Sequence, residues 1–170
     1  MIVEDGTGLP NADSYVSIEF ADSYFSARGV TDWTALTQAK KEVALICATD
    51  YIDNVFQWYG KKQFEGQSLR FPRVNIKDYE GEDIVGVPNC LKQAVCDTAL
   101  MSANGTTLFQ TQNENGDVVS ENITQLSFTY SKSEKSTTSK TLYDAINTKL
   151  RGLFKDSGNA QIVSGKVERV

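Results

Sequence analysis

The chain has 170 residues, a net charge of −5 and 40% hydrophobic residues, which fits one domain with a modest core and excludes two ordinary domains. Aromatic residues make up 10% of the sequence, enough to anchor a core, and this excludes a wholly disordered chain. No apolar run approaches the roughly 20 residues of a membrane-spanning helix, and the first six residues lack the features of a signal peptide. We therefore expect a soluble protein made in the cytosol.

The first half of the chain predicts two substantial helices. Turn-forming residues fill positions 1–14. Ser17 can cap a helix over 17–28 that Gly29 closes, and Asp32 can cap a short turn after it. The longest helix is expected over 37–59, with Gly60 at its end. Its apolar residues form two adjacent rows that make one core-facing stripe: Val43, Cys47, Tyr51 and Val55 in one row, Ala44, Ala48, Ile52 and Phe56 in the other.

The second half predicts two further helices and a β element. Residues 61–86 read as extended or irregular, and Pro88 suits the first position of a helix over 87–103. A turn signal between two β-prone runs predicts a hairpin over about 106–130. A polar loop over 131–140 and a fourth amphipathic helix over 141–154 follow.

We therefore expect a mainly α fold: a four-helix bundle-like domain over 1–154, with a small β-hairpin insertion between its third and fourth helices and an extended tail over 155–170. The residues expected in the core are Phe20, Tyr24, Phe25, Trp33, Cys47, Tyr51, Val55, Phe71 and Leu91. In the tail, the β-prone Ile162, Val163 and Val167 can add a strand to a partner, and a frayed chain end is the alternative.

Charge is unevenly distributed along the chain. Residues 1–32 and 78–121 carry net charges of −5 and −7, whereas residues 61–77 and 132–155 each carry +4. The overall acidic balance argues against bulk electrostatic capture of nucleic acid. Segregated charge suits a protein that meets differently charged partners on different faces, but patchy surface charge is also common, and both interpretations stay open.

The sequence offers no pattern for catalysis or metal binding. It has three cysteines and no histidine, which excludes Ser-His-Asp and Cys-His catalysis and gives no paired CxxC zinc site. The acidic residues Glu80, Glu82 and Asp83 lack EF-hand spacing, so we interpret them as a solvated turn. We expect no enzymatic activity, no cofactor and no metal.

Aromatic and basic residues interleave between positions 58 and 73: Trp58, Tyr59, Phe64 and Phe71 with Lys61, Lys62, Arg70 and Arg73. Proteins that bind single strands stack bases on aromatic rings beside basic side chains. The alternative, favoured by the acidic net charge, is that the aromatic residues belong to the core and the basic stems cover it. If the chain binds DNA, the four basic residues are the expected contacts.

The first 17 residues, MIVEDGTGLPNADSYVS, closely resemble the start of tailed-bacteriophage head-tail connector (adaptor) proteins, a group sometimes labelled DnaT-like single-stranded DNA-binding proteins. Shorter matches follow in order: ADSYF at 21–25, ATDYID at 48–53, FEG at 64–66, LRFPR at 69–73 and VP at 87–88. The resemblance covers roughly residues 1–103. Phe71 stands where a Trp is expected, a packing-neutral change. Ile46-Cys47 replaces an expected basic pair, so a role of those charges is not carried over.

The resemblance implies a structural subunit of the phage neck that completes the head and lets the genome pass during ejection. Identical copies, typically twelve, would form a ring that contacts the portal protein and a tail or tail-terminator (nozzle) protein. DNA would pass through the lumen without sequence-specific binding, no membrane would be involved, and the ring would join the virion after assembly in the host cytoplasm. Candidate interface residues are Arg70, Arg73, Ile162, Val163 and Val167.

Two other functions stay open at this point. One is a monomeric single-stranded DNA-binding accessory protein, as the DnaT-like label implies. The other is a small host-interacting phage protein without a fixed assembly. A binding protein needs a net basic groove, whereas a ring needs a neutral or acidic lumen past which DNA slides. The net charge of −5, with its segregated patches, therefore fits the ring better.

Overall fold

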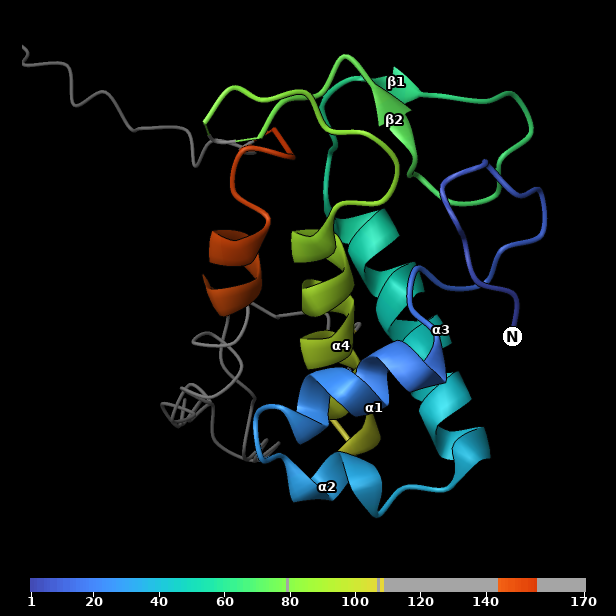
Figure 1. Ribbon diagram of the computed structural model, residues 1–170, viewed down its shortest axis with the longest axis vertical. Coiled ribbons are helices and arrows are strands. Elements are labelled where there is room, and N and C mark those ends of the chain that lie inside the picture. The colour runs from blue at the N-terminus through green and yellow to red at the C-terminus, as the bar shows by residue number, and fades with distance from the viewer. Residues whose placement is uncertain (79, 107, 109–143, 156–170) are drawn as a thin grey trace, which may run out of the picture.

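The computed structural model describes residues 1–78, 80–106, 108 and 144–155 as a helical assembly with a small β-sheet at one end (Figure 1). Its helices are α1 (Ile18–Ser26), α2 (Thr31–Thr34), α3 (Gln38–Val55) and α4 (Asn89–Ala103), and a further short helix covers residues 144–149. Strands β1 (Lys61–Lys62) and β2 (Arg73–Val74) pair antiparallel between α3 and α4. The expected fold class, mainly α with a small β element, is confirmed.

The described sheet lies at a different place from the predicted hairpin. Residues 61–86 were expected to be extended or irregular, and they contain β1 and β2. Except for residues 106, 108 and 155, the hairpin over about 106–130, the loop over 131–140 and the tail over 155–170 lie outside the described residues. Within the described ranges, none of the helices combines the length and the apolar character needed to cross a bilayer.

Helix α1 begins at the predicted cap but ends at Ser26, two residues before its predicted end, with Ala27 as its C-cap. The Ser17 side chain accepts a hydrogen bond from the Phe20 N–H (3.2 Å), and Gly29, just beyond the helix, has a φ of 66°. The expectation that Asp32 caps α2 is wrong. Val30 occupies the N-cap, and Asp32 lies in the first turn, where its negative charge still complements the helix dipole.

Helix α3 ends four residues before its predicted end. Phe56 is extended (φ −97°, ψ 136°), and the chain then runs beside residues 153–155. The Lys155 N–H donates to the Gln57 carbonyl (2.6 Å), and the Tyr59 N–H donates to the Leu153 carbonyl (3.0 Å). These backbone partners lie almost 100 residues further along the chain, so the local helical pattern could not predict where α3 ends.

The buried face of α3 is also rotated away from the predicted stripe. Val43 is 60% exposed, whereas Leu45 and Thr49, outside both predicted rows, are buried together with Ala44, Ala48 and Ile52. Thr49 can be buried because its hydroxyl donates to the Leu45 carbonyl (2.9 Å). This face packs along α4 (Figure 1), and small Ala side chains on both helices allow a close approach.

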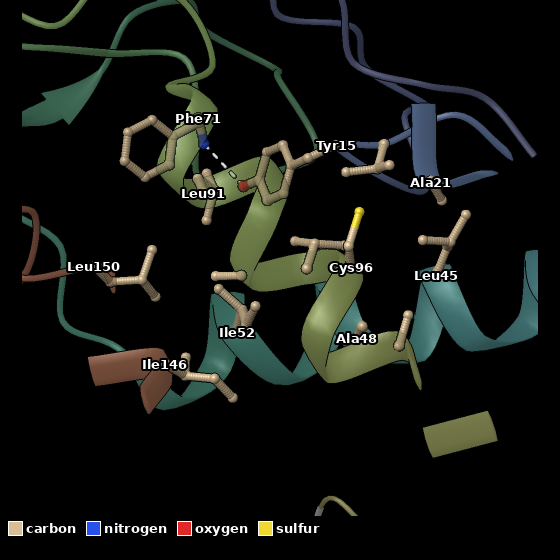
Figure 2. Close-up of a cluster of buried hydrophobic side chains, with 14 of the residues drawn as sticks. Tyr15, Ala21, Leu45, Ala48, Ile52, Phe71, Leu91, Cys96, Ile146 and Leu150 are labelled. Carbon is tan, nitrogen blue, oxygen red and sulfur yellow. Dashed lines mark hydrogen bonds between the residues drawn. The ribbon is translucent and has the colours of Figure 1, made fainter. Parts of the chain in front are cut away.

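The core joins α1, α3 and α4 with residues 146–153 (Figure 2). The structure buries five of the residues expected there: Tyr24, Phe25, Trp33, Phe71 and Leu91. The other four are half-buried at its edge: Phe20, Cys47, Tyr51 and Val55. The last three lie on the flank of α3 because of the rotation of its buried face.

A polar cluster attaches the short 144–149 helix to the rest of the molecule. The Lys149 ammonium donates to the Asp97 carboxylate on α4 and to the Tyr24 hydroxyl on α1 (3.0 Å). The Tyr24 hydroxyl in turn donates to Asp97 (2.9 Å). Despite the burial of its ammonium group, these two partners raise the pKa of Lys149, so the residue stays charged and holds both helices.

Candidate functional site

The interleaved aromatic and basic residues lie at the end of the molecule that carries β1 and β2 (Figure 1). The structure divides the set into three groups by burial. Trp58 and Phe71 are buried, and their rings stack edge to face with centroids 5.0 Å apart. Arg73 is half-buried. The other five side chains are exposed, and we call this exposed set the hairpin face: Tyr59 (44% exposed), Lys61, Lys62, Phe64 (40% exposed) and Arg70. Lys61 and Lys62, consecutive in β1, point to opposite sides of the strand.

Gly60 makes the turn into β1 possible. Its φ of 68° lies in the left-handed region, and a Cβ at this position would come 2.2 Å from the Val74 carbonyl oxygen. Only glycine therefore lets the two strands approach here. The resulting register pairs Lys61 with Val74 and Lys62 with Arg73.

Arg73 holds the two ends of the hairpin together. Its Nε donates to the Tyr59 carbonyl (2.6 Å), its Nη2 to the Gly60 carbonyl (2.9 Å) and its Nη1 to the Arg70 carbonyl (3.1 Å). Burial of this guanidinium, and then the neighbouring charge of Arg70, lower the pKa of Arg73. Arg73 is thus a positioning residue, and it brings the Arg70 backbone next to Gly60, the residue before Lys61.

Gln67 organises the loop that links the two strands. Its side chain is buried, accepts the Phe64 N–H (3.0 Å) and donates to the carbonyls of Leu69 (2.9 Å) and Pro72 (3.1 Å). The Lys62 ammonium donates to the Gln67 carbonyl (2.8 Å). The loop is therefore fixed by its own hydrogen bonds, and Lys62 takes part in fixing it.

A polar network ties the hairpin face to the helices. The Tyr15 hydroxyl donates to Asp53 on α3 (2.7 Å) and accepts the Phe71 N–H (3.0 Å; Figure 2), and Asp53 also accepts the Arg70 N–H (2.9 Å). Burial raises the pKa of Asp53 to about 6, against the hydrogen bonds from Tyr15 and Arg70 that lower it. Burial likewise raises the pKa of Tyr15. The network thus holds the Arg70 backbone against α3, while the Arg70 side chain is exposed.

We expect Asp53 to make the folded state less stable as the pH rises from about 4 to about 7. Between about pH 4 and pH 6 the unfolded carboxyl group is mostly ionised, whereas the folded one, with a pKa of about 6, still binds a proton; above pH 6 the folded group ionises as well. Proton binding therefore favours the folded state at the acidic end. The free energy of unfolding of the wild type, relative to Asp53→Asn, should fall by about 2 kcal/mol over the interval. Urea unfolding of both proteins at several pH values measures this difference, and a constant difference would contradict the assignment.

The structure places the other candidate residues as follows. Arg73 is half-buried and bonded to the backbone of Tyr59, Gly60 and Arg70, and the acidic residues Glu80, Glu82 and Asp83 are exposed around a turn at Asp78. Ile162, Val163 and Val167 lie outside the described residues. Sequence reasoning missed Gln67 and Tyr15 as positioning residues. The roles of both residues depend on tertiary hydrogen bonds. The available sequence signal was their position: Tyr15 lies in the opening motif, and Gln67 lies between the motifs at 64–66 and 69–73.

The whole chain, residues 1–170, matches the model of a family described as "Putative DnaT-like ssDNA binding protein". No curated protein sequence and no solved structure matches the chain. The family match confirms the DnaT-like part of the sequence resemblance. It carries no statement about a ring, a portal or a phage neck.

Proposed function

We propose that this chain, which belongs to the DnaT-like ssDNA binding family, binds single-stranded DNA through the hairpin face. The observation that carries the proposal is the composition of that face. Tyr59 and Phe64 are exposed in the same short stretch as Lys61, Lys62 and Arg70. Bases stack on exposed rings and phosphates pair with neighbouring cations, and single-strand-binding proteins use this combination.

The net charge of −5 is compatible with this function because the relevant charge is local. Between residues 61 and 77, five basic residues stand against one acidic residue, Glu65. At about 0.1 M salt, charges more than ~10 Å apart are largely screened from one another. The acidic remainder of the molecule weakens long-range attraction, so we expect a modest affinity, on the order of micromolar at physiological salt.

Lys61→Ala and Arg70→Ala should each weaken binding to a single-stranded oligothymidylate several-fold. Each should also reduce the slope of log K against log salt by about 0.7, the value per phosphate contact on single strands. Arg73 and Lys62 are not used for this test, because both bond to backbone carbonyls of the hairpin. Substituting either of them would change the structure of the hairpin face as well as its charge. Fluorescence anisotropy between about 50 and 200 mM salt measures both effects.

The matched control is Lys40→Ala. Lys40 is an exposed lysine near the start of α3, at the opposite end of that helix from the hairpin (Figure 1). Its removal changes the net charge by the same amount as Lys61→Ala and should leave both affinity and salt slope unchanged. Equal losses in the control and the hairpin variants would show a nonspecific charge effect and contradict the proposed site.

A second candidate function is a subunit of an adaptor ring between the portal and tail of a tailed phage. The acidic net charge favours it, because DNA slides past an acidic lumen without being held. The sequence resemblance over roughly residues 1–103 favours it as well. This function would involve about twelve copies in a ring, contacts to portal and tail proteins, a location in the virion neck and no catalysis. The isolated chain would then bind single strands poorly.

A further inference from the structure

The Phe64 side chain rests on the backbone of the N-terminal segment, which Figure 1 shows beside the loop between β1 and β2. A Cβ at Gly8 would lie 2.4 Å from Cδ2 and 2.9 Å from Cβ and Cγ of Phe64. The lack of a side chain at position 8 therefore lets the ring lie against the chain. Phe64 still exposes 40% of its surface, so it is supported on one side and accessible to solvent.

Hydrogen bonds fix the backbone around this contact. The Phe64 N–H donates to the buried Gln67 side chain (3.0 Å), and the Ser68 N–H donates to the Leu9 carbonyl (3.1 Å). In the N-terminal segment, the buried Glu4 carboxylate accepts the N–H groups of Gly8 and Leu9, each at 2.8 Å. Because the Phe64 ring already has a defined position, little conformational entropy is lost when a ligand stacks on it.

We propose that Phe64 is a stacking platform for one unpaired base, and that it makes the hairpin face select single strands. This inference rests on the proposed function. Lys61 and Arg70, in the same segment, supply cations for the phosphates of the strand that carries the base. A base within a duplex is already stacked on both sides and has no free face for the ring. Base stacking on an aromatic side chain is worth ~1–3 kcal/mol, so the base contribution to affinity should be roughly 5- to 150-fold.

The test compares two ligands that have the same phosphates and differ in their bases. One is an oligothymidylate of about 12 nucleotides, and the other is an abasic strand of the same length. The full chain should bind the oligothymidylate at least about fivefold more tightly at equal salt. Phe64→Leu keeps an apolar side chain and removes the aromatic face, so it should lose most of this preference, retain only the part that Tyr59 supplies, and keep the affinity for the abasic strand. Val43→Ala, an exposed apolar residue on α3, is the control and should behave as the wild type.

Phe64→Trp provides a second readout that does not depend on the stability of the leucine variant. Its indole should stack with a base, so its fluorescence should be quenched by the oligothymidylate and unchanged by the abasic strand. Equal affinities of the wild type for both strands, a full preference in Phe64→Leu, or an unquenched indole would overturn the stacking role. In those cases, weaker binding of the oligothymidylate by Lys61→Ala would still support single-strand binding through the hairpin face. If the wild type bound neither strand, the proposed function would fail, and the stacking role with it.

Discussion

Phe25→Ala should lower the free energy of unfolding by about 3–5 kcal/mol, the usual cost of removing a fully buried aromatic side chain. Phe25 is 1% exposed, and its ring lies between Tyr24 (centroids 5.2 Å apart) and Trp33 (4.8 Å). Removing it takes away one of the contacts between α1 and α2, beside the hydrogen bond from Trp33 to Asp22 (2.7 Å), and leaves a cavity in the core. Urea unfolding monitored by circular dichroism measures the loss.

Two comparison variants make this result specific. Val43→Ala, at a largely exposed position of α3, should change stability by less than about 0.5 kcal/mol. Tyr51 is half-buried, so Tyr51→Ala should cost less than Phe25→Ala, although the helical rows alone place both residues in the core. Equal losses of unfolding free energy in Phe25→Ala and Val43→Ala would contradict the burial of Phe25 between α1 and α2.

Glu4→Gln should destabilise the protein by about 2–3 kcal/mol, a large effect for the exchange of one atom group. The Glu4 side chain is buried, and its two oxygens accept three backbone N–H groups: those of Gly6, Gly8 and Leu9, each at 2.8 Å. An amide has one acceptor oxygen, so in the variant at least one of these donors faces an NH₂ group. Thermal or urea unfolding measures the change.

The control for Glu4→Gln is Asp5→Asn, the same chemical change at an exposed neighbour. Asp5 accepts the N–H and the hydroxyl of Thr7 at the surface, where water can replace a lost partner, so little change is expected. If Glu4→Gln were as stable as Asp5→Asn, the N-terminal loop would not depend on the buried carboxylate. The close contact of the Phe64 ring with Gly8 would then have to be held by other interactions.

The parts of the fold that local signals determine could be predicted from the sequence. Ser17 caps α1 with its own side chain, and α4 ends at Ala103 as predicted, although Pro88 is the N-cap of α4 and not its first residue. The end of α3 could not be predicted because Gln57 and Tyr59 take their backbone partners from Lys155 and Leu153. The rotation of its buried face was missed because Thr49, a polar residue, satisfies its hydroxyl within the helix.

The candidate site shows the same division. The alternation of aromatic and basic residues was visible in the sequence, but only the structure shows that Trp58 and Phe71 are buried whereas Tyr59 and Phe64 are exposed. The opening motif is specific for a structural reason. Glu4, Ser14 and Tyr15 are all buried and hydrogen-bonded. A likeness at these positions therefore indicates a shared fold more directly than it indicates a shared partner.

The most direct test of the binding function is native mass spectrometry of the full chain, alone and with a single-stranded oligothymidylate, in the presence and absence of a phage portal protein. Binding through the hairpin face predicts complexes of the chain with the oligonucleotide at micromolar concentration, which form several-fold more weakly in Lys61→Ala and as strongly as in the wild type in Lys40→Ala. A ring of about twelve copies that forms alone or on the portal and retains no oligonucleotide would contradict it and establish the adaptor function instead.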